Sequence, residues 1–269
     1  MLGTSAAAAF LGAGHAAADP IDDVAGALTQ QLSNSSADFG LPDLLTMVPG
    51  VGDLLRGNGA PGTTRCTSVI QIGDSTSVGV DSPAKVPTPA DTLSAQYKRV
   101  GATTVDLDAD GGRSIVETVS GHPNAAETVS THLAKGEKGC WVIAMGVNDA
   151  ANIAVGSTVH ADERIDRIMN QLAGQPVLWP TVTTSNPSVR GYSAAAMASF
   201  NNALRRAVVR YPNLAIYDWA AAAKPAWFVD GIHYTAAGTA ERNRRFADAL
   251  ATAFPPGAGV TPASRWVSG

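Results

Sequence analysis

The sequence has little charge and few cysteines, and each shortage excludes a class of protein or site. Charged residues make up 16% of the chain and the net charge is -4, so the sequence lacks the basic excess that attracts nucleic acid. No apolar run is long enough to cross a membrane as a helix. The five histidines do not cluster with the two cysteines, and we therefore expect no metal site.

The first residues are typical of a secretory signal. Residues 6–12 form a small apolar run, and three alanines precede Asp19 as a small-residue cleavage site. The start carries no Lys or Arg, so either the true start lies upstream or the signal is weak. We expect a signal peptide over residues 1–18, a secreted or cell-envelope location, and a loosely ordered extension over residues 19–64.

From residue 65 onward, patterns typical of strands and helices alternate. With 45% apolar residues, the chain can bury the core of one α/β domain. The alternation predicts a three-layer α/β/α sandwich around a five-stranded parallel sheet, with the flavodoxin-like strand order 2-1-3-4-5. We expect this domain to span residues 65–254 and the Pro- and Gly-rich segment 255–269 to be a flexible tail. The expected strands are 67–73, 103–108, 141–145, 176–183 and 214–219.

Both cysteines immediately precede expected strands. Cys66 comes before the first strand and Cys140 before the third. In the expected strand order these two strands are parallel neighbours, so the cysteines lie at the same edge of the sheet, within disulfide reach. We predict a Cys66–Cys140 disulfide; the alternative is two free buried thiols, as in a cytosolic protein.

The first strand ends in residue types that begin helices. Its apolar run stops at Gly73, and residues 74–77 read Asp-Ser-Thr-Ser. A strand that turns abruptly into a helix places the turn at the carboxyl end of the sheet, where open α/β sheets bind ligands. The Ser75 hydroxyl would then project into a crevice. The alternative is that Ser75 only caps the helix.

Two further strand-to-helix turns would meet Ser75 at the same edge. Gly112 follows the second strand and Asn148 the third. A glycine lets its N–H approach a ligand closely, and the asparagine side chain offers an NH₂ donor. Together with the Ser75 N–H, these donors would surround an oxyanion that develops in acyl transfer. Taken singly, the glycine also suits an ordinary turn and Asn148 a helix cap.

The last expected loop holds a carboxylate three residues before a histidine. In Asp230-Gly-Ile-His233, Asp230 can accept a hydrogen bond from Nδ1 of the imidazole and leave Nε2 facing outward. This is the orienter and base of a serine triad, in the chain order Ser, Asp, His. A surface Asp–His pair is the alternative interpretation.

Taken together, these segments resemble a known family. Over about residues 67–254, the chain resembles the SGNH hydrolases, the GDSL-type esterase superfamily. The residues that carry the resemblance are Gly73-Asp74-Ser75, Gly112, Gly146-x-Asn148-Asp149 and Asp230-x-x-His233. The resemblance implies Ser75 as nucleophile, His233 as base and Asp230 as its orienter. It also implies an oxyanion hole made by the N–H groups of Ser75 and Gly112 and by the Asn148 side chain.

Two departures from the family pattern bear on function. Thr76 stands where the motif name has leucine, at a position that faces the scaffold. The segment Gly-Gly-Arg-Ser at 111–114 resembles the second block of carbohydrate acetylesterases, which implies sugar-ester substrates. The chain is also similar to the SGNH domains attached to membrane acyltransferases in actinobacteria.

These features predict a secreted serine esterase that hydrolyses acyl esters, acetyl esters included, of carbohydrate, lipid or small alcohols. It would need no metal or organic cofactor, and its partner would be a small-molecule or glycan ester rather than nucleic acid. Activity should fall on acidification because the imidazole must be neutral to act as a base. One alternative is an acyltransferase that moves the acyl group to an envelope glycan or lipid alcohol; another is a glycan-binding module with a vestigial site.

Other residues near the expected site have two interpretations. Arg113, Trp227 and Phe228, with Tyr234 beside them, flank the site and would contact substrate, although Trp and Phe are more often packing residues. The arginines of the last two helices are expected to lie on solvated faces. These are Arg205, Arg206, Arg242, Arg244 and Arg245.

Overall fold

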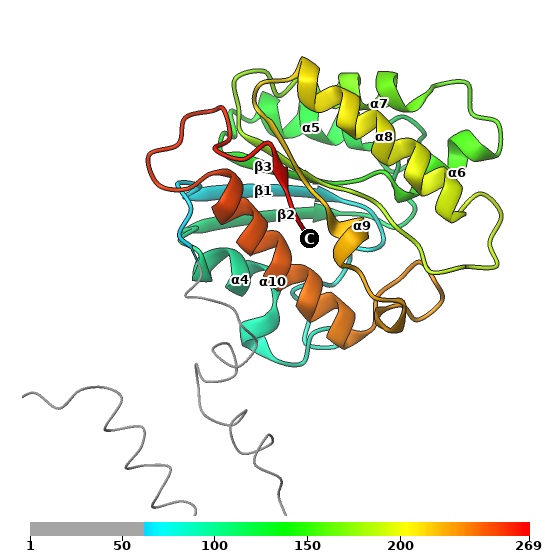
Figure 1. Ribbon diagram of the computed structural model, residues 1–269, viewed down its shortest axis with the longest axis horizontal. Coiled ribbons are helices and arrows are strands. Elements are labelled where there is room, and N and C mark those ends of the chain that lie inside the picture. The colour runs from blue at the N-terminus through cyan, green and yellow to red at the C-terminus, as the bar shows by residue number, and fades with distance from the viewer. Residues whose placement is uncertain (1–61) are drawn as a thin grey trace, which may run out of the picture. The chain divides into compact units, whose positions relative to one another are not determined.

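The computed structural model describes residues 62–269. The expected signal peptide and all but the last three residues of the expected extension lie outside the described residues. A parallel sheet of six strands forms the middle layer, in the order β2-β1-β3-β4-β5-β6 (Figure 1). The predicted three-layer α/β/α fold and the order of its first five strands are confirmed. The strands are β1 (Ser68–Gly73), β2 (Thr104–Ala109), β3 (Cys140–Ala144), β4 (Val177–Pro180), β5 (Leu214–Tyr217) and β6 (Trp266–Val267).

The sixth strand is a correction to the expected five-stranded sheet and flexible tail. β6 comes from the segment 255–269 and pairs in parallel with β5, with Ile216 opposite Trp266. The Ile216 N–H donates to the carbonyl of Arg265 at 3.0 Å, and the Arg205 guanidinium lies 4.9 Å from the centre of the Trp266 ring. A two-residue strand is too short to show the alternating pattern by which strands are recognised in a sequence.

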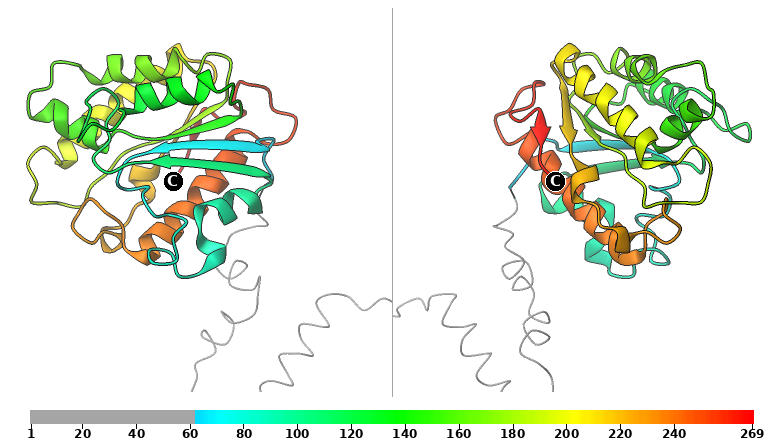
Figure 2. Two further views of the ribbon diagram at one scale, coloured as in Figure 1. Left: turned by 180° about the vertical axis from the view of Figure 1, so that it is seen from behind. Right: turned by 45° about the vertical axis from the view of Figure 1, so that its right-hand side comes forward.

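Helices cover both faces of the sheet, as Figures 1 and 2 show. Helices α5 to α8 pack on one face, and α4, α9 and α10 on the other. Successive strand residues alternate between the two cores: Trp141 and Ile143 of β3 join the first, and Val142 joins the second. The helices are α4 (Leu93–Arg99), α5 (Ala125–Ala134), α6 (Val147–Ala154), α7 (Ala161–Met169), α8 (Ala194–Arg210), α9 (Trp219–Ala222) and α10 (Ala236–Ala253), with short 3₁₀ turns at Pro89–Asp91 and Pro225–Trp227.

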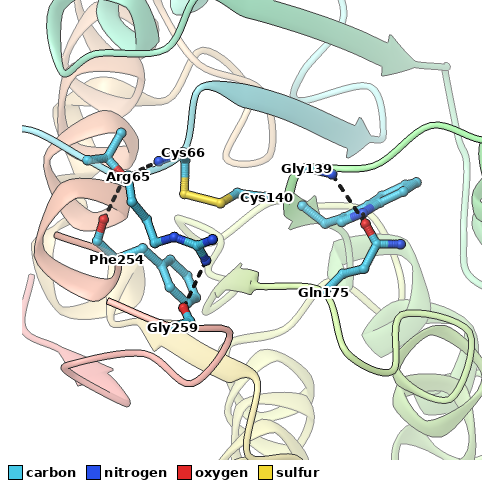
Figure 3. The surroundings of a disulfide bond; sticks show 9 residues. Arg65, Cys66, Gly139, Cys140, Gln175, Phe254 and Gly259 are labelled. Atoms are coloured by element: carbon cyan, nitrogen blue, oxygen red, sulfur yellow. Dashed lines mark hydrogen bonds between the residues drawn. A yellow bond between two sulfur atoms is a disulfide. The ribbon is translucent and has the colours of Figure 1, made fainter. Parts of the chain in front are cut away.

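The predicted Cys66–Cys140 disulfide is confirmed (Figure 3). Cys140 is the first residue of β3 and lies opposite Val69 of β1, while Cys66 precedes β1. The disulfide therefore joins the amino ends of the neighbouring strands β1 and β3. Both cysteines are buried. The cross-link thus lies at the edge of the sheet opposite the turns that follow β1 and β3.

A buried ion-pair network joins the turns at the carboxyl edge. The Arg164 side chain of α7 is fully buried, and its Nη1 donates to Asp149 Oδ1 at 2.8 Å and to Glu117 Oε2 at 2.5 Å. Asp149 Oδ1 also accepts the Ile115 N–H at 2.8 Å. Burial raises the pKa of Glu117, but hydrogen bonds from Arg164 and two serines outweigh it and lower that pKa to about 2. The network ties the segment after β2 to helices α6 and α7.

The disulfide makes a direct prediction. A thiol reagent should find no free cysteine in the denatured, unreduced protein. Reduction should lower the free energy of unfolding by about 4 kcal/mol in the loop-entropy account, because the bond closes a loop of 74 residues. Urea unfolding of the oxidised and reduced protein measures this difference. Two labelled cysteines in the unreduced protein would show that the bond does not form.

The ion-pair network makes a second prediction. Arg164→Leu should lower the free energy of unfolding by about 3–5 kcal/mol, because it leaves the buried Asp149 carboxylate without its cation. Arg167→Leu on the same helix is the matched control. Arg167 is 46% exposed and pairs with Glu163 across one helical turn, so its loss should cost less than about 1 kcal/mol. Equal losses in the two variants would contradict the role given to Arg164.

Candidate active site

The structure brings the three residues of the predicted triad together. Ser75 lies in the turn after β1, and Asp230 and His233 lie in the loop before α10. His233 Nε2 is 3.0 Å from Ser75 Oγ, across 158 residues of sequence. His233 Nδ1 is 2.7 Å from Asp230 Oδ2. The order hydroxyl, imidazole, carboxylate is that required for a base-activated serine.

The Asp230 carboxylate is fixed by its own loop. Its Oδ1 accepts the N–H of Ile232 at 2.9 Å and the N–H of His233 at 2.7 Å. Burial raises the pKa of Asp230, but the hydrogen bonds from the His233 ring and from these two N–H groups outweigh it and hold that pKa well below its usual range. The carboxylate is therefore ionised, and it favours the tautomer in which Nδ1 carries the proton and Nε2 faces Ser75.

Close packing requires a glycine at position 231, between Asp230 and His233. Gly231 has φ +85, and a Cβ built on it would lie 2.6 Å from the carbonyl oxygen of Ser185. The Ser185 N–H in turn donates to the Gly231 carbonyl at 2.7 Å. Only a glycine fits this contact, so the His233 loop is fastened to the loop that follows β4.

The candidate oxyanion donors lie at the same edge. Gly73, the last residue of β1, is opposite Ala109 of β2 and Ala144 of β3. These three strand residues are aligned across the sheet. The candidate donors follow them by two, three and four residues: Ser75, Gly112 and Asn148. Within residues 62–269, neither the Ser75 N–H nor the Gly112 N–H donates a hydrogen bond to the protein. Both donors are thus free for a ligand.

Asn148 lies in the first turn of α6 and is 5% exposed. Its Nδ2 donates to the Arg113 carbonyl at 2.8 Å, and its Oδ1 accepts from the Tyr192 hydroxyl at 2.7 Å. An amide nitrogen carries two hydrogens, so one remains for an oxyanion. Tyr192 is a site residue that the sequence does not reveal, because it follows no motif and lies in a loop without periodicity.

Buried neighbours of Ser75 fix the conformation of the turn that carries it. Asp74 is buried, and its Oδ1 accepts from both the N–H and the hydroxyl of Thr76 at 2.8 and 2.7 Å. Burial raises the pKa of Asp74, against these hydrogen bonds and the charge of Arg242. A Cβ on Gly73 would lie 2.5 Å from the Ser77 Cβ. The turn therefore needs glycine at 73 and packs Thr76 inward, as expected.

Arg242 contradicts the expectation of a solvated helix face. It is 3% exposed, and its Nη2 donates to Ser77 Oγ at 3.0 Å beneath the turn. Its guanidinium carbon lies 4.3 Å from the centre of the Phe246 ring and 5.6 Å from that of Tyr234. Aromatic faces stabilise a buried guanidinium, and the pairing of Arg242 with Phe246 one helical turn on is a signal that the sequence does contain.

Arg113 is not placed to contact substrate. It is 6% exposed, and its Nη1 donates to the carbonyls of Gly73 at 3.2 Å and Asp108 at 3.0 Å. Its Nη2 also pairs with the Asp108 carboxylate at 2.9 Å. The side chain therefore braces the ends of β1 and β2. These contacts favour a structural role over the expected substrate contact, because they engage the guanidinium with backbone carbonyls at two strand ends.

Trp227 and Phe228 pack against the second core. The Trp227 ring stacks on Trp219 with centroids 5.8 Å apart, and the Phe228 ring lies 4.8 Å from that of Tyr234. Phe228 also forms an antiparallel bridge with Tyr234, the residue after His233. These contacts favour the packing interpretation, in which the aromatic rings support the His233 loop.

One group in the described part of the chain resembles a cation site. Donor atoms of Asp106, His132 and Glu137 lie within 4.8 Å of one another. However, His132 Nδ1 is 2.5 Å from Glu137 Oε2, and Nε2 is 3.1 Å from Asp108 Oδ2. Burial lowers the pKa of His132, but these carboxylates outweigh it and raise that pKa. Both ring nitrogens of His132 therefore have a carboxylate partner within the protein.

No protein-family model matches the chain, and neither does any curated protein. Among solved structures, the C-terminal catalytic domain of peptidoglycan O-acetyltransferase A from Streptococcus pneumoniae, with a methylsulfonyl adduct, is 19% identical; the match covers 70% of this chain and 92% of that one at a TM-score of 0.50. A carbohydrate acetylesterase family member from Sinorhizobium meliloti is 15% identical, with coverage of 69% and 97% and a TM-score of 0.55. Est24, a carbohydrate acetylesterase from the same organism, is 17% identical, with coverage of 70% and 99% and a TM-score of 0.51. At these identities the likeness establishes the fold alone: the described domain shares the fold of these three proteins.

Proposed function

We propose that this chain is a serine hydrolase that cleaves acyl esters through an acyl-enzyme on Ser75. The observation that carries the proposal is the pair of contacts on His233, 3.0 Å to the Ser75 hydroxyl and 2.7 Å to the Asp230 carboxylate. An imidazole held in this way can take the proton of the serine as it attacks.

The reaction proceeds in two steps. Ser75 Oγ attacks the ester carbonyl while its proton passes to His233 Nε2, and Asp230 stabilises the imidazolium. The oxyanion accepts hydrogen bonds from the N–H groups of Ser75 and Gly112 and from Asn148 Nδ2. Collapse of this intermediate expels the alcohol, which takes the proton from His233. Water then attacks the acyl-enzyme while His233 takes a proton from it; the bond between the acyl group and Ser75 Oγ breaks, the acid leaves, and the proton returns from His233 to Ser75 Oγ.

The proposed substrates are acyl esters, acetyl esters included, of carbohydrate, lipid or small alcohols. The side chains of His233 and Asp230 are 41% and 52% exposed, so a bulky alcohol such as a glycan can approach the base. The fold shared with a carbohydrate acetylesterase family member supports a sugar ester. The chemistry needs no metal or organic cofactor.

A location outside the cytoplasm is part of the proposal. The disulfide favours an oxidising compartment, and the first residues of the sequence are typical of a secretory signal. Among the described residues, no helix combines the length and the apolar character needed to cross a membrane.

An acyltransferase is the second candidate, and two observations support it. The fold is shared with the catalytic domain of a peptidoglycan O-acetyltransferase, and the exposed His233 is open to an alcohol as well as to water. Both reactions use the same acyl-enzyme. Product analysis with and without a sugar acceptor separates them, because a transferase forms the new ester where a hydrolase releases free acid. A glycan-binding module is disfavoured by the assembled triad.

The central prediction concerns the nucleophile. Ser75→Ala should lower kcat for chromogenic acyl esters by about 10⁴-fold or more, because no other hydroxyl is positioned on His233 Nε2 in residues 62–269. Ser199→Ala, at an exposed position of α8, is the matched control and should leave kcat unchanged. A chain-length series of esters measured with both variants would also report the preferred acyl group. Wild-type rates in Ser75→Ala would overturn the proposal.

The pH profile tests the base. Protonation of His233 removes the lone pair that receives the serine proton, so kcat/KM should fall as pH is lowered from about 8 to about 5. Asp230 stays ionised over this range because its pKa is held well below the usual value, so its own protonation does not cause the fall. A profile that is flat over the same range would contradict His233 as base.

A further inference from the structure

Both polar atoms of the Asn148 side-chain amide form hydrogen bonds within the protein. Its Nδ2 donates to the Arg113 carbonyl at 2.8 Å, and its Oδ1 accepts from the Tyr192 hydroxyl at 2.7 Å. A carboxamide that flipped by 180° would present Oδ1 to the Arg113 carbonyl and lose the hydrogen bond from Tyr192. The two contacts therefore select one orientation, with the second Nδ2 hydrogen left free.

Tyr192 lies in the loop between β4 and α8, residues 181–193, and this loop is anchored at its start. The Val182 N–H donates to Asn201 Oδ1 at 2.8 Å, and Asn201 Nδ2 donates back to the Val182 carbonyl at 2.8 Å. Asn201 is a residue of α8. The paired bonds thus fix the first residues of the loop against the helix that follows it.

The end of the loop is anchored on α6, the helix that carries Asn148. Gly191 has φ +92, and a Cβ built on it would lie 2.8 Å from the Ala151 carbonyl. The Thr184 hydroxyl donates to the Tyr192 carbonyl at 2.8 Å. Only glycine allows this close approach to α6. The packing of Gly191 on α6 therefore places the next residue, Tyr192, beside Asn148.

The middle of the same loop contacts the segment that carries the candidate base, His233. The Ser185 N–H donates to the Gly231 carbonyl at 2.7 Å, and Gly231 lies between Asp230 and Ile232 of the His233 loop. One loop therefore contacts both the candidate oxyanion donor and the segment that carries the candidate base. This places Tyr192 within the structure that sets the relative positions of the two groups.

We propose that Tyr192 is a positioning residue that orients and polarises the Asn148 amide for the oxyanion. A hydroxyl that donates to an amide oxygen draws charge from the nitrogen and strengthens its N–H as a donor. The effect is realised where negative charge develops on the substrate oxygen, so it should appear in kcat more than in KM. The inference rests on the proposed function, since it requires an acyl-transfer reaction at Ser75.

The test is Tyr192→Phe, which removes the hydroxyl and keeps the ring. We expect kcat for a chromogenic ester to fall about tenfold, with KM changed less than about twofold. Tyr211→Phe, at the opposite end of α8, is the control: its hydroxyl also lies 3.0 Å from an asparagine Oδ1, that of Asn170, and donates to Asp166 Oδ1 at 2.8 Å. The control should keep wild-type kcat.

A double-mutant cycle separates positioning from packing. Asn148→Ala should lower kcat by about 10²–10³-fold, and adding Tyr192→Phe to it should cost nothing further, because the hydroxyl acts only through the amide. A tenfold loss that persists in the Asn148→Ala background would overturn the inference, as would wild-type kcat in Tyr192→Phe. A wild-type protein without any activity on esters would instead contradict the proposed function.

Discussion

The hydrogen bond between Ser75 Oγ and His233 Nε2 depends on the parallel sheet that brings residues 158 positions apart to one edge. Because all strands run the same way, every strand-to-helix turn ends at that edge. β1 supplies the hydroxyl, β2 and β3 lead to Gly112 and Asn148, and the loop before α10 supplies the imidazole. The parallel sheet thus brings the candidate catalytic groups, which lie in separate segments of the sequence, to one site.

The amino ends and the carboxyl ends of the strands are stabilised by different interactions. At the amino ends, the Cys66–Cys140 bond joins β1 to β3 covalently. At the carboxyl ends, the polar groups of the site are held by other buried polar groups: Arg113 on strand carbonyls and Arg164 on Asp149. A hydrophobic core alone cannot fix the orientation of an amide or a carboxylate, whereas paired hydrogen bonds can. The candidate site is therefore supported by side chains that are themselves buried.

Much of the fold and of the candidate site can be predicted from the sequence, because the patterns that indicate them are local. Apolar runs mark the strands, Gly73 marks the close approach to Ser77, and the spacing of Asp230 and His233 suffices for one tight loop. Tyr192, the burial of Arg242 and β6 are not predicted, since each depends on contacts between distant segments. Arg242 is buried where it donates to Ser77 Oγ, 165 residues away in the chain, and Arg113 donates to strand-end carbonyls whose register no single sequence reveals.

The most direct measurement of the central claim is labelling by an organophosphonate, a reagent that reacts with a base-activated serine. The account predicts that wild-type protein gains one adduct, located on Ser75 by peptide mass spectrometry, and that His233→Ala gains none under the same conditions. An adduct on another residue, or equal labelling of Ser75 in His233→Ala, would contradict it, because activation would then not come from the imidazole that lies 3.0 Å from the hydroxyl.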